Sequence, residues 1–181
     1  AFDNAFRLRA VTLSPNALFS AAALALVGDE PIAVASPDVG GVKRAQLWRE
    51  ALEATLGRPV AQAFVDKRRA AGVVSGGEVV TGEVSGATVL IVDDLIATFG
   101  TIERAASALR KAGARRTFAF AAHGLFVAPA AEVLEHTSVE RVFVTDTVPL
   151  FRLDGRPGRD RVGVLPCAAL FADAIRHELT S

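Results

Sequence analysis

The stretch that decides the fold is Val89-Leu-Ile-Val-Asp-Asp-Leu-Ile-Ala-Thr-Phe-Gly-Thr101. Its first four residues are all apolar, and such an unbroken run is typical of a parallel strand buried on both faces. The chain then turns polar at Asp93 and Asp94 and passes through a Thr-Phe-Gly-Thr turn. Residues 102–113 follow, with apolar positions at helical spacing and Gly113 as a stop. The stretch therefore predicts a buried strand, an acidic pair at its carboxyl end, and a helix start.

Outward from this stretch, strand-like and helix-like segments alternate along the chain. Strands are predicted at residues 31–36, 60–65, 78–84, 117–122, 141–145 and 161–165, and helices at 14–28, 45–56, 129–136 and 166–179. Residues 78–84 are expected to form an edge or antiparallel strand, and the Gly- and Ala-rich residues 70–77 a mobile loop. The alternation predicts an α/β fold, with a doubly wound, mostly parallel sheet in one domain covering residues 1–181.

The composition argues against several classes of function, among them general nucleic-acid binding and membrane proteins. The 181 residues suffice for one well-packed domain, and a formal net charge of zero gives no general attraction to nucleic acid, although 17 of the 20 cationic residues are arginines. No apolar tract is long enough to cross a membrane and no signal peptide is evident, so no membrane partner is expected. Cys167 is the only cysteine, which favours a cytoplasmic protein. The lack of methionine indicates a fragment or a processed start.

Unusual polar residues gather in four predicted loops. These loops are Asp38-Val-Gly-Gly41, Asp66-Lys-Arg-Arg69, residues 93–101, and Thr145-Asp-Thr147. In a doubly wound sheet, ligands bind where loops leave the carboxyl ends of the strands. The four loops are therefore the candidate site.

The loop at residues 93–101 has the features of a sugar-phosphate site. Unpaired N–H groups and the positive end of the helix dipole favour a phosphate at the helix start, and Thr98 and Thr101 add hydroxyls. Asp93 and Asp94 can accept hydrogen bonds from two neighbouring sugar hydroxyls or hold Mg²⁺. A solvated loop with a simple helix cap explains the same residues equally well.

Two further loops suit a diphosphate. Adjacent glycines after Asp38 allow close backbone approach to phosphate while the carboxylate holds Mg²⁺, although a plain turn has the same composition. The cations at 67–69 fit a phosphoryl-transfer clamp or a solvated charge run. His123, without an evident partner, is interpreted as a packing residue. No zinc-like spacing and no nucleophile elbow occur in the sequence.

Five motifs together resemble those of ribose-phosphate pyrophosphokinases, the phosphoribosyl pyrophosphate synthetases. They are Ser36-Pro-Asp-Val-Gly-Gly-Val-Lys-Arg44, Val65-Asp-Lys-Arg-Arg69, Val89-Leu-Ile-Val-Asp-Asp94, His123-Gly-Leu-Phe126 and Val144-Thr-Asp-Thr-Val-Pro149. The similarity runs from about Ser14 to the C-terminus and matches the C-terminal half of that family. It implies a type I phosphoribosyltransferase-like, Rossmann-like domain. Adenine-type phosphoribosyltransferases share the central motif, but the combination favours the synthetase.

The resemblance also implies an activity and a set of roles. Family members transfer the β,γ-diphosphoryl group of MgATP to the 1-hydroxyl of ribose 5-phosphate, so Mg²⁺, ATP, ribose 5-phosphate and a homo-oligomer are expected. By similarity, Asp38 is a Mg²⁺ ligand, and Gly40 and Gly41 face the diphosphate. Lys67 and Arg69 are implied to be catalytic, and Arg69 also to bind substrate. Asp93 and Asp94 are implied to hold the ribose hydroxyls, and the 5-phosphate is surrounded by Ala97, Thr98, Phe99, Gly100 and Thr101.

Two features depart from the family pattern. Phe99 stands where a small residue is usual, and Ala97 where Asp or Ser is usual. If position 99 needs a positive φ or backbone contact with phosphate, the phenyl group strains or plugs the loop; otherwise it points outward. The family's preceding half, with its adenine pocket and Asp-Leu-His metal motif, has no counterpart in these 181 residues. Two alternatives therefore stay open: a phosphoribosyltransferase that consumes phosphoribosyl pyrophosphate, and a non-catalytic homologue that binds sugar phosphates or a partner subunit.

Overall fold

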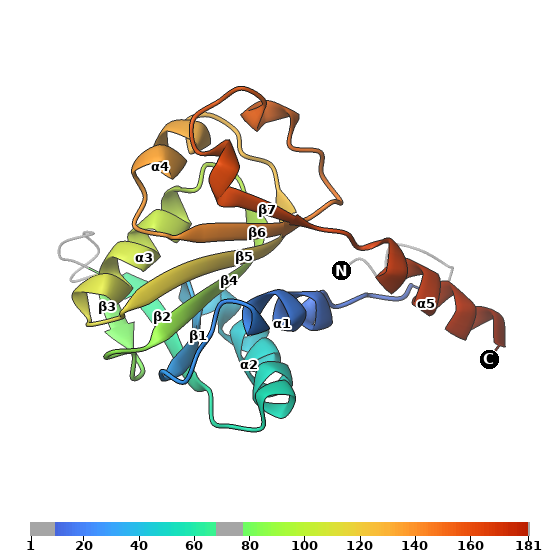
Figure 1. Cartoon of the computed structure of the whole chain (residues 1–181), viewed down its shortest axis with the longest axis horizontal. Coiled ribbons are helices and arrows are strands. Elements are labelled where there is room, and N and C mark those ends of the chain that lie inside the picture. Colours follow the sequence, from blue (N-terminus) through green and yellow to red (C-terminus); the bar gives the residue numbers. More distant parts are fainter. Residues whose placement is uncertain (1–9, 68–77, 181) are drawn as a thin grey trace.

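The computed structural model describes residues 10–67 and 78–180. Its strands are β1 (Ile32–Ser36), β2 (Ala61–Lys67), β3 (Glu78–Thr81), β4 (Thr88–Ile96), β5 (Arg116–Gly124), β6 (Arg141–Thr145) and β7 (Val162–Leu165), and its α-helices are α1 (Asn16–Leu24), α2 (Val42–Leu56), α3 (Gly100–Lys111), α4 (Ala130–His136) and α5 (Ala168–Thr180). The strands form one seven-stranded sheet in the order β3-β2-β1-β4-β5-β6-β7 (Figure 1). All pairs are parallel except β2 with β3. The predicted α/β class and antiparallel edge strand are confirmed.

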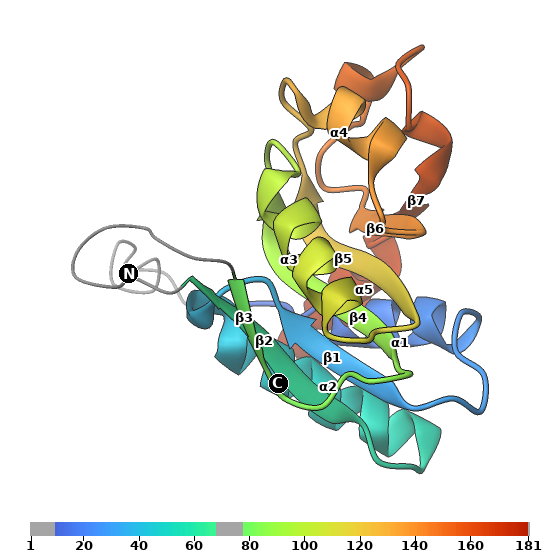
Figure 2. The ribbon, with the colours of Figure 1, turned by 90° about the vertical axis from the view of Figure 1, so that its left-hand side faces the viewer.

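Helices cover both faces of the sheet, which explains why its central strands are apolar throughout. Helices α1 and α2 lie on one face and α3 and α4 on the other (Figure 2). On the first face, Phe19 of α1 and Trp48 of α2 pack against Phe120 of β5, with ring centroids 4.8–5.5 Å apart. The buried indole N–H donates to Ser20 Oγ at 3.1 Å, so burying Trp48 leaves no donor unpaired. On the second face, Ile102 and Leu109 of α3 join the core.

Several element ends differ from the predicted ones; the strand predicted at residues 78–84, for example, ends at Thr81. Hydrogen bonds account for three of these differences. β4 continues past its apolar run and pairs with β5 as far as Ile96, so the acidic pair lies inside the strand rather than after it. β2 runs on to Lys67 because β3 supplies a partner for its last residues. α1 ends at Leu24, since the N–H groups of residues 26 and 27 both donate to the carbonyl of Ala23 and close the helix before Gly28.

Two further predictions concern a mobile loop and membrane-spanning segments. The loop predicted at residues 70–77 lies outside the described residues. Across residues 10–67 and 78–180, no helix combines the length and apolar character needed to cross a bilayer.

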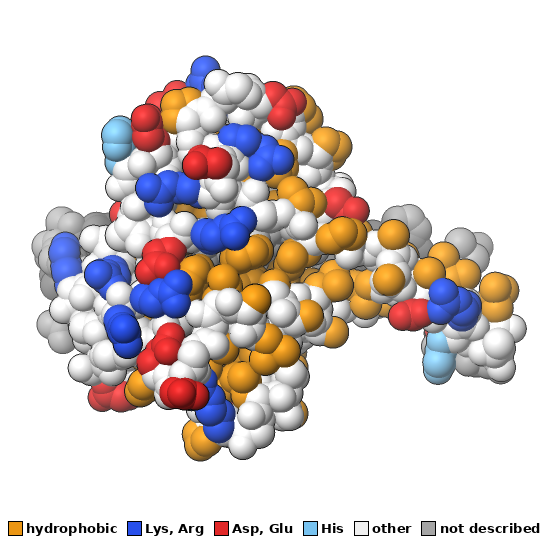
Figure 3. Space-filling model, viewed as in Figure 1, with side chains coloured by type: hydrophobic (Ala, Val, Ile, Leu, Met, Phe, Trp, Pro, Cys, Tyr) orange, Lys and Arg blue, Asp and Glu red, His pale blue; other side chains and the backbone are white. Residues whose placement is uncertain are grey.

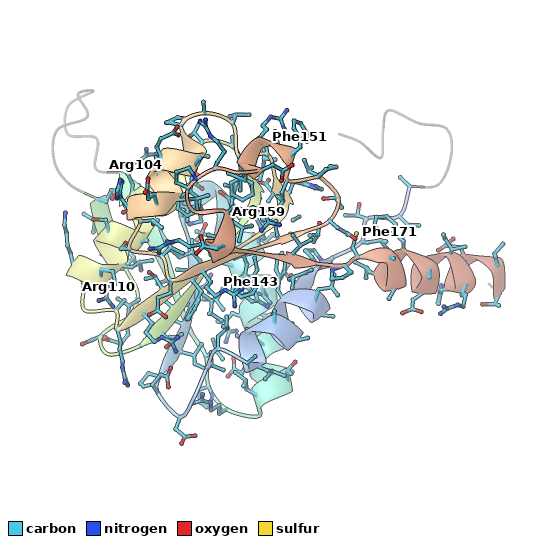
Figure 4. The ribbon with its side chains drawn as sticks, turned by 45° about the horizontal axis from the view of Figure 1, so that its top comes forward. Arg104, Arg110, Phe143, Phe151, Arg159 and Phe171 are labelled. Atoms are coloured by element: carbon cyan, nitrogen blue, oxygen red, sulfur yellow. The ribbon has the colours of Figure 1, made fainter. Side chains whose placement is uncertain are left out.

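Helix α5 leads away from the sheet and forms an arm beside the rest of the domain (Figure 1). None of its residues is buried, and Phe171 stands on it at a distance from the sheet (Figure 4). Phe171, Ile175 and Leu179 are exposed and, with Val11 and Leu13, border an open apolar hollow of about 290 Å³. The arm is correspondingly rich in apolar surface (Figure 3). We call this set of apolar residues the α5 arm face.

Gly82, which follows β3, is expected to tolerate no side chain. Its φ of +111° is unfavourable for L-residues, and a Cβ there would strike the backbone of β2, lying 2.8 Å from the Cα of Ala63. Neither backbone can move without breaking the β2–β3 pairing. We expect Gly82→Ala to lower the free energy of unfolding in urea by about 3 kcal/mol, combining overpacking and backbone strain. Gly86→Ala is the control, since Gly86 also has a positive φ, +67°, but open space around it. Equal losses in the two variants would contradict this.

Candidate functional site

The candidate site lies between the two central strands of the sheet. β1 continues outward to β2, and β4 continues in the opposite direction to β5. Loops that leave the carboxyl ends of two such strands diverge toward opposite faces and leave a crevice, the usual ligand site in doubly wound sheets. The loop starting at Asp38 and the segment from Asp93 to Thr101 leave the sheet here. Two of the four predicted loops therefore border one crevice.

The segment from Ala97 to Thr101 forms a small pocket at the start of α3. Asp93, Ala97, Thr98, Phe99 and Thr101 are among the residues that line it, and its volume is about 90 Å³. The first helical hydrogen bond runs from the Glu103 N–H to the Phe99 carbonyl at 3.0 Å. The N–H groups of the first turn therefore have no acceptor within the helix, and they sit at the positive end of its dipole. A pocket of this size and polarity suits one phosphate group.

Phe99 does not point outward, so that alternative is wrong. The side chain is 2% exposed and packs in the apolar core beside Ile96 and Ile102. Its backbone has the left-handed conformation, with φ at 65°. This conformation turns β4 sharply into α3 and costs a non-glycine residue roughly 1–2 kcal/mol. Burial of the ring offsets that cost. The Phe99 side chain therefore anchors the loop on the core, while other atoms of Phe99 line the pocket.

Arg104, the fifth residue of α3, lies beside the same pocket and was not foreseen from the sequence. Its guanidinium donates to Thr101 Oγ1 at 3.2 Å and pairs with Glu78 of β3 at 3.4 Å. The available signal was its spacing, three residues after Thr101 on a predicted helix. The pocket thus has one cation next to its hydroxyl and N–H donors.

Asp93 and Asp94 are bridged by Arg44, the third residue of α2. Arg44 Nη1 donates to Asp93 Oδ1 at 3.0 Å and Nη2 donates to Asp94 Oδ2 at 2.6 Å. The Asp94 N–H also donates to Asp93 Oδ1, at 2.9 Å. The pKa of Asp93 is raised to about 6, chiefly because the carboxyl is partly buried and also because the charged Asp94 lies beside it. The Asp94 N–H and Arg44 act in the opposite direction and keep this pKa from rising further. Arg44 belongs to a motif quoted above, but only the adjacency of β1 and β4 showed that it reaches the acidic pair.

The loop after β1 is organised around Asp38. Its Oδ1 accepts hydrogen bonds from the Gly40 and Gly41 N–H groups at 2.9 and 3.2 Å, and Ser36 Oγ donates to the Asp38 carbonyl at 2.6 Å. The two glycine N–H groups that were expected to face a diphosphate are thus turned toward Asp38. A Cβ on Gly41 would lie 2.5 Å from Ser36 Oγ and 2.9 Å from Arg44 Nη1, so this position needs glycine for packing reasons.

Asp38 fits one mode of Mg²⁺ binding. Its side chain is exposed, and Oδ2 accepts no hydrogen bond from the described residues. No group of three or more His, Cys, Asp or Glu side chains among those residues could hold a metal. Mg²⁺ in phosphate sites commonly takes one or two carboxylates together with substrate oxygens and water. The residues present therefore suit a Mg²⁺ ion that arrives with a diphosphate, rather than a permanent metal cage.

Comparison with known families decides the assignment. The model of the phosphoribosyl synthetase-associated domain matches residues 73–179, more than half of the chain. The chain belongs to this family.

Individual relatives of this phosphoribosyl synthetase-associated domain agree. Ribose-phosphate pyrophosphokinase of Clostridium acetobutylicum is 39% identical over 148 residues, which are 82% of this chain and 44% of that protein. The enzyme of the same name from Haemophilus ducreyi is 41% identical over 80% of this chain and 43% of its own length. A crystal structure of phosphoribosylpyrophosphate synthetase from Mycobacterium smegmatis gives a TM-score of 0.73 at 32% identity, covering 92% of this chain and 51% of that one. The predicted fold is confirmed, and the chain spans about half the length of these relatives.

Three more of the residues considered from the sequence are Lys67, Arg69 and His123. Lys67 is the last residue of β2 and pairs in register with Glu78 of β3, while Arg69 lies outside the described residues. His123 does have a partner, contrary to the interpretation above: its Nδ1 lies 2.7 Å from Thr147 Oγ1. Thr145 and Thr147 in turn both donate to the Ala122 carbonyl. This cluster fixes the fourth predicted loop at the same edge of the sheet.

Proposed function

We propose that this chain acts as the C-terminal half of a ribose-phosphate pyrophosphokinase, binding ribose 5-phosphate and contributing to diphosphoryl transfer from MgATP. The observation that carries the proposal is the placement of a one-phosphate pocket at a helix start beside two adjacent carboxylates. Ribose 5-phosphate has a matching pattern, with one phosphate and two neighbouring hydroxyls. The relatives named above support the reaction class.

Each predicted residue has a proposed role in binding. Ala97, Thr98, Phe99, Gly100 and Thr101 surround the 5-phosphate, mainly through backbone N–H groups and two hydroxyls. Asp93 and Asp94 accept hydrogen bonds from the ribose hydroxyls. These contacts orient the sugar so that its 1-hydroxyl points into the crevice between β1 and β4.

The diphosphate side of the reaction is assigned to the loops after β1 and β2. Asp38 holds Mg²⁺, which would neutralise charge on the phosphoryl oxygens when bound. Gly40 and Gly41 keep the loop close to the diphosphate, since neither carries a side chain. Lys67 and Arg69 supply the positive charge that a phosphoryl-transfer transition state needs. We further propose a homo-oligomer, as the resemblance implies, and a cytoplasmic location, as the single cysteine suggests.

Of the alternatives, the non-catalytic homologue loses one of its two supports. It rested on Phe99 closing the phosphate loop and on the family's preceding half having no counterpart in these residues; the buried ring leaves the pocket beside Thr98 and Thr101 open. A phosphoribosyltransferase that consumes phosphoribosyl pyrophosphate would use the same sugar-phosphate contacts. Base-dependent release of diphosphate would identify it.

The test is isothermal titration of ribose 5-phosphate into the 181-residue chain with Mg²⁺ present. We expect saturable binding of ribose 5-phosphate, weaker binding of inorganic phosphate, and still weaker binding of ribose, because the phosphate makes the charge-assisted contacts. Ribose 5-phosphate that binds no better than inorganic phosphate would contradict the assignment of Asp93 and Asp94 to the sugar. No binding of either phosphate compound would contradict the proposed function as a whole.

A further inference from the structure

Arg44 joins the two halves of the crevice. Its backbone belongs to α2, directly after the Asp38 loop, whereas both of its carboxylate partners belong to β4. The Arg44 side chain is one-third exposed and the Asp93 side chain is 18% exposed, so this contact is partly shielded from water. A planar guanidinium can place two parallel N–H groups on two acceptors at once, which a lysine ammonium cannot do with the same geometry.

The contact leaves part of each carboxylate available. Arg44 and the Asp94 N–H occupy Asp93 Oδ1, and Arg44 occupies Asp94 Oδ2. The opposite oxygens, Asp93 Oδ2 and Asp94 Oδ1, accept no hydrogen bond from the described residues. Asp93 is partly buried and lies beside the exposed Asp94. Adjacent carboxylates repel each other, and without a cation the partly buried Asp93 would take up a proton. A protonated carboxyl accepts fewer hydrogen bonds from a sugar.

We propose that Arg44 is a positioning residue for this site: it holds Asp93 and Asp94 side by side as a pair of anions and presents their remaining oxygens to two adjacent hydroxyls of the sugar. The sugar part of this inference rests on the proposed function. Gly41 serves the same arrangement, because a side chain there would press on the Arg44 guanidinium. The loop that holds the diphosphate is thereby linked mechanically to the acidic pair that holds the sugar.

Other charged groups around the pair could share this role. Lys43 of α2 lines a hollow that Asp93 and Asp94 also line. Asp38 lies in the loop before α2, and His123 of β5 pairs in register with Leu95, the residue after Asp94. None of these three donates a hydrogen bond to Asp93 or Asp94 in the described part of the chain. His123 is instead held by Thr147. Arg44 is therefore the group whose removal should change the ionisation of the pair.

The first measurement needs no ligand. The carboxyl ¹³C shift of Asp93 is followed against pH in the intact chain and in Arg44→Gln, Arg44→Lys and Arg49→Gln. We expect Arg44→Gln to raise the pKa of Asp93 by about one to three units, the usual effect of losing an arginine partner, and Arg44→Lys to raise it less. Arg49→Gln, on the same helix but paired with Glu50 and Glu53, should leave it unchanged. An unchanged pKa in Arg44→Gln would overturn the proposal.

The second measurement is ribose 5-phosphate titration between pH 7 and 8.5, where the sugar's own phosphate is already a dianion. At pH 7, we expect Arg44→Gln to bind ribose 5-phosphate about tenfold more weakly than the unchanged chain does, because a loss of this size corresponds to one charge-assisted hydrogen bond. The variant should recover part of this affinity as the pH rises. A merely structural role for Arg44 gives a loss that does not depend on pH, which would overturn the proposal. If the unchanged chain does not bind the sugar phosphate, the proposed function fails, while the ligand-free titration still decides the role of Arg44.

Discussion

Replacing both aspartates of the pair by asparagine, Asp93→Asn with Asp94→Asn, is expected to weaken binding of ribose 5-phosphate by 100-fold or more. Each carboxylate is expected to accept a charge-assisted hydrogen bond, and such bonds contribute about 1.5–3 kcal/mol each. Two lost bonds correspond to about 3–6 kcal/mol, of which part remains because an amide oxygen still accepts. Isothermal titration at pH 8, where the Asp93 carboxyl is ionised, measures the loss.

A remote control and a second ligand, inorganic phosphate, show whether the loss is specific to the sugar. Asp173→Asn alters an exposed aspartate on α5, paired with Arg176 and far from the crevice, and should leave binding unchanged. Inorganic phosphate should bind the double variant at least as well as it binds the unchanged chain, since the hydroxyls of Thr98 and Thr101 are unchanged and Asp93, which also lines this pocket, loses only a negative charge. If phosphate binding falls along with sugar-phosphate binding, the carboxylates support the loop rather than the sugar.

Removing the ring of Phe99 is expected to cause the largest loss of stability of any single change at the site. Phe99→Ala deletes a fully buried phenyl group, which typically costs about 3–5 kcal/mol of unfolding free energy. Phe99→Gly deletes the same ring but relieves the strain of the positive φ, so it should be more stable than Phe99→Ala by about 1 kcal/mol. Urea unfolding followed by circular dichroism compares the three chains.

The order of the two variants is the sharper part of this prediction. At an ordinary helical or extended position, alanine would be the more stable of the two. Phe126→Leu serves as a control because it changes another buried phenylalanine with positive φ, 46°, but keeps an apolar side chain. If Phe99→Gly unfolds as easily as Phe99→Ala, the left-handed conformation is not a source of strain. If neither variant loses stability, the ring does not anchor the loop.

Most of the fold followed from local sequence patterns, because the signals were short-range. The apolar run at residues 89–92 and the periodicity of residues 102–113 specify a strand and a helix without knowledge of the partners. The extension of β4 to Ile96 was missed since Asp93 and Asp94 carry no strand propensity of their own; pairing with β5 imposes the extended conformation. Tertiary hydrogen bonding overrode the local preference.

The sequence suggested individual residues of the candidate site, but not the contacts between them. Candidate roles for Asp93, Thr98 and Thr101 came from their place at a strand end and a helix start, and those roles stay predictions. That Arg44 reaches Asp93 across 49 positions depends on the pairing of β1 with β4, which no local pattern encodes. The orientation of Phe99 likewise depended on which face of the loop the core occupies. Contacts between distant segments are what the structure adds.

The α5 arm face has a practical consequence for the colloidal behaviour of the chain. Proteins associate most readily where their net charge approaches zero, and here the formal charge at pH 7 is zero with a sequence pI of about 7.1. The exposed α5 arm face adds a short-range attraction between copies of the chain. Near pH 7 the copies carry no net charge, so no long-range repulsion between them opposes this attraction. Solubility should therefore be lowest near neutrality, and the chain is best handled in mildly alkaline buffer, where Asp93 is also ionised.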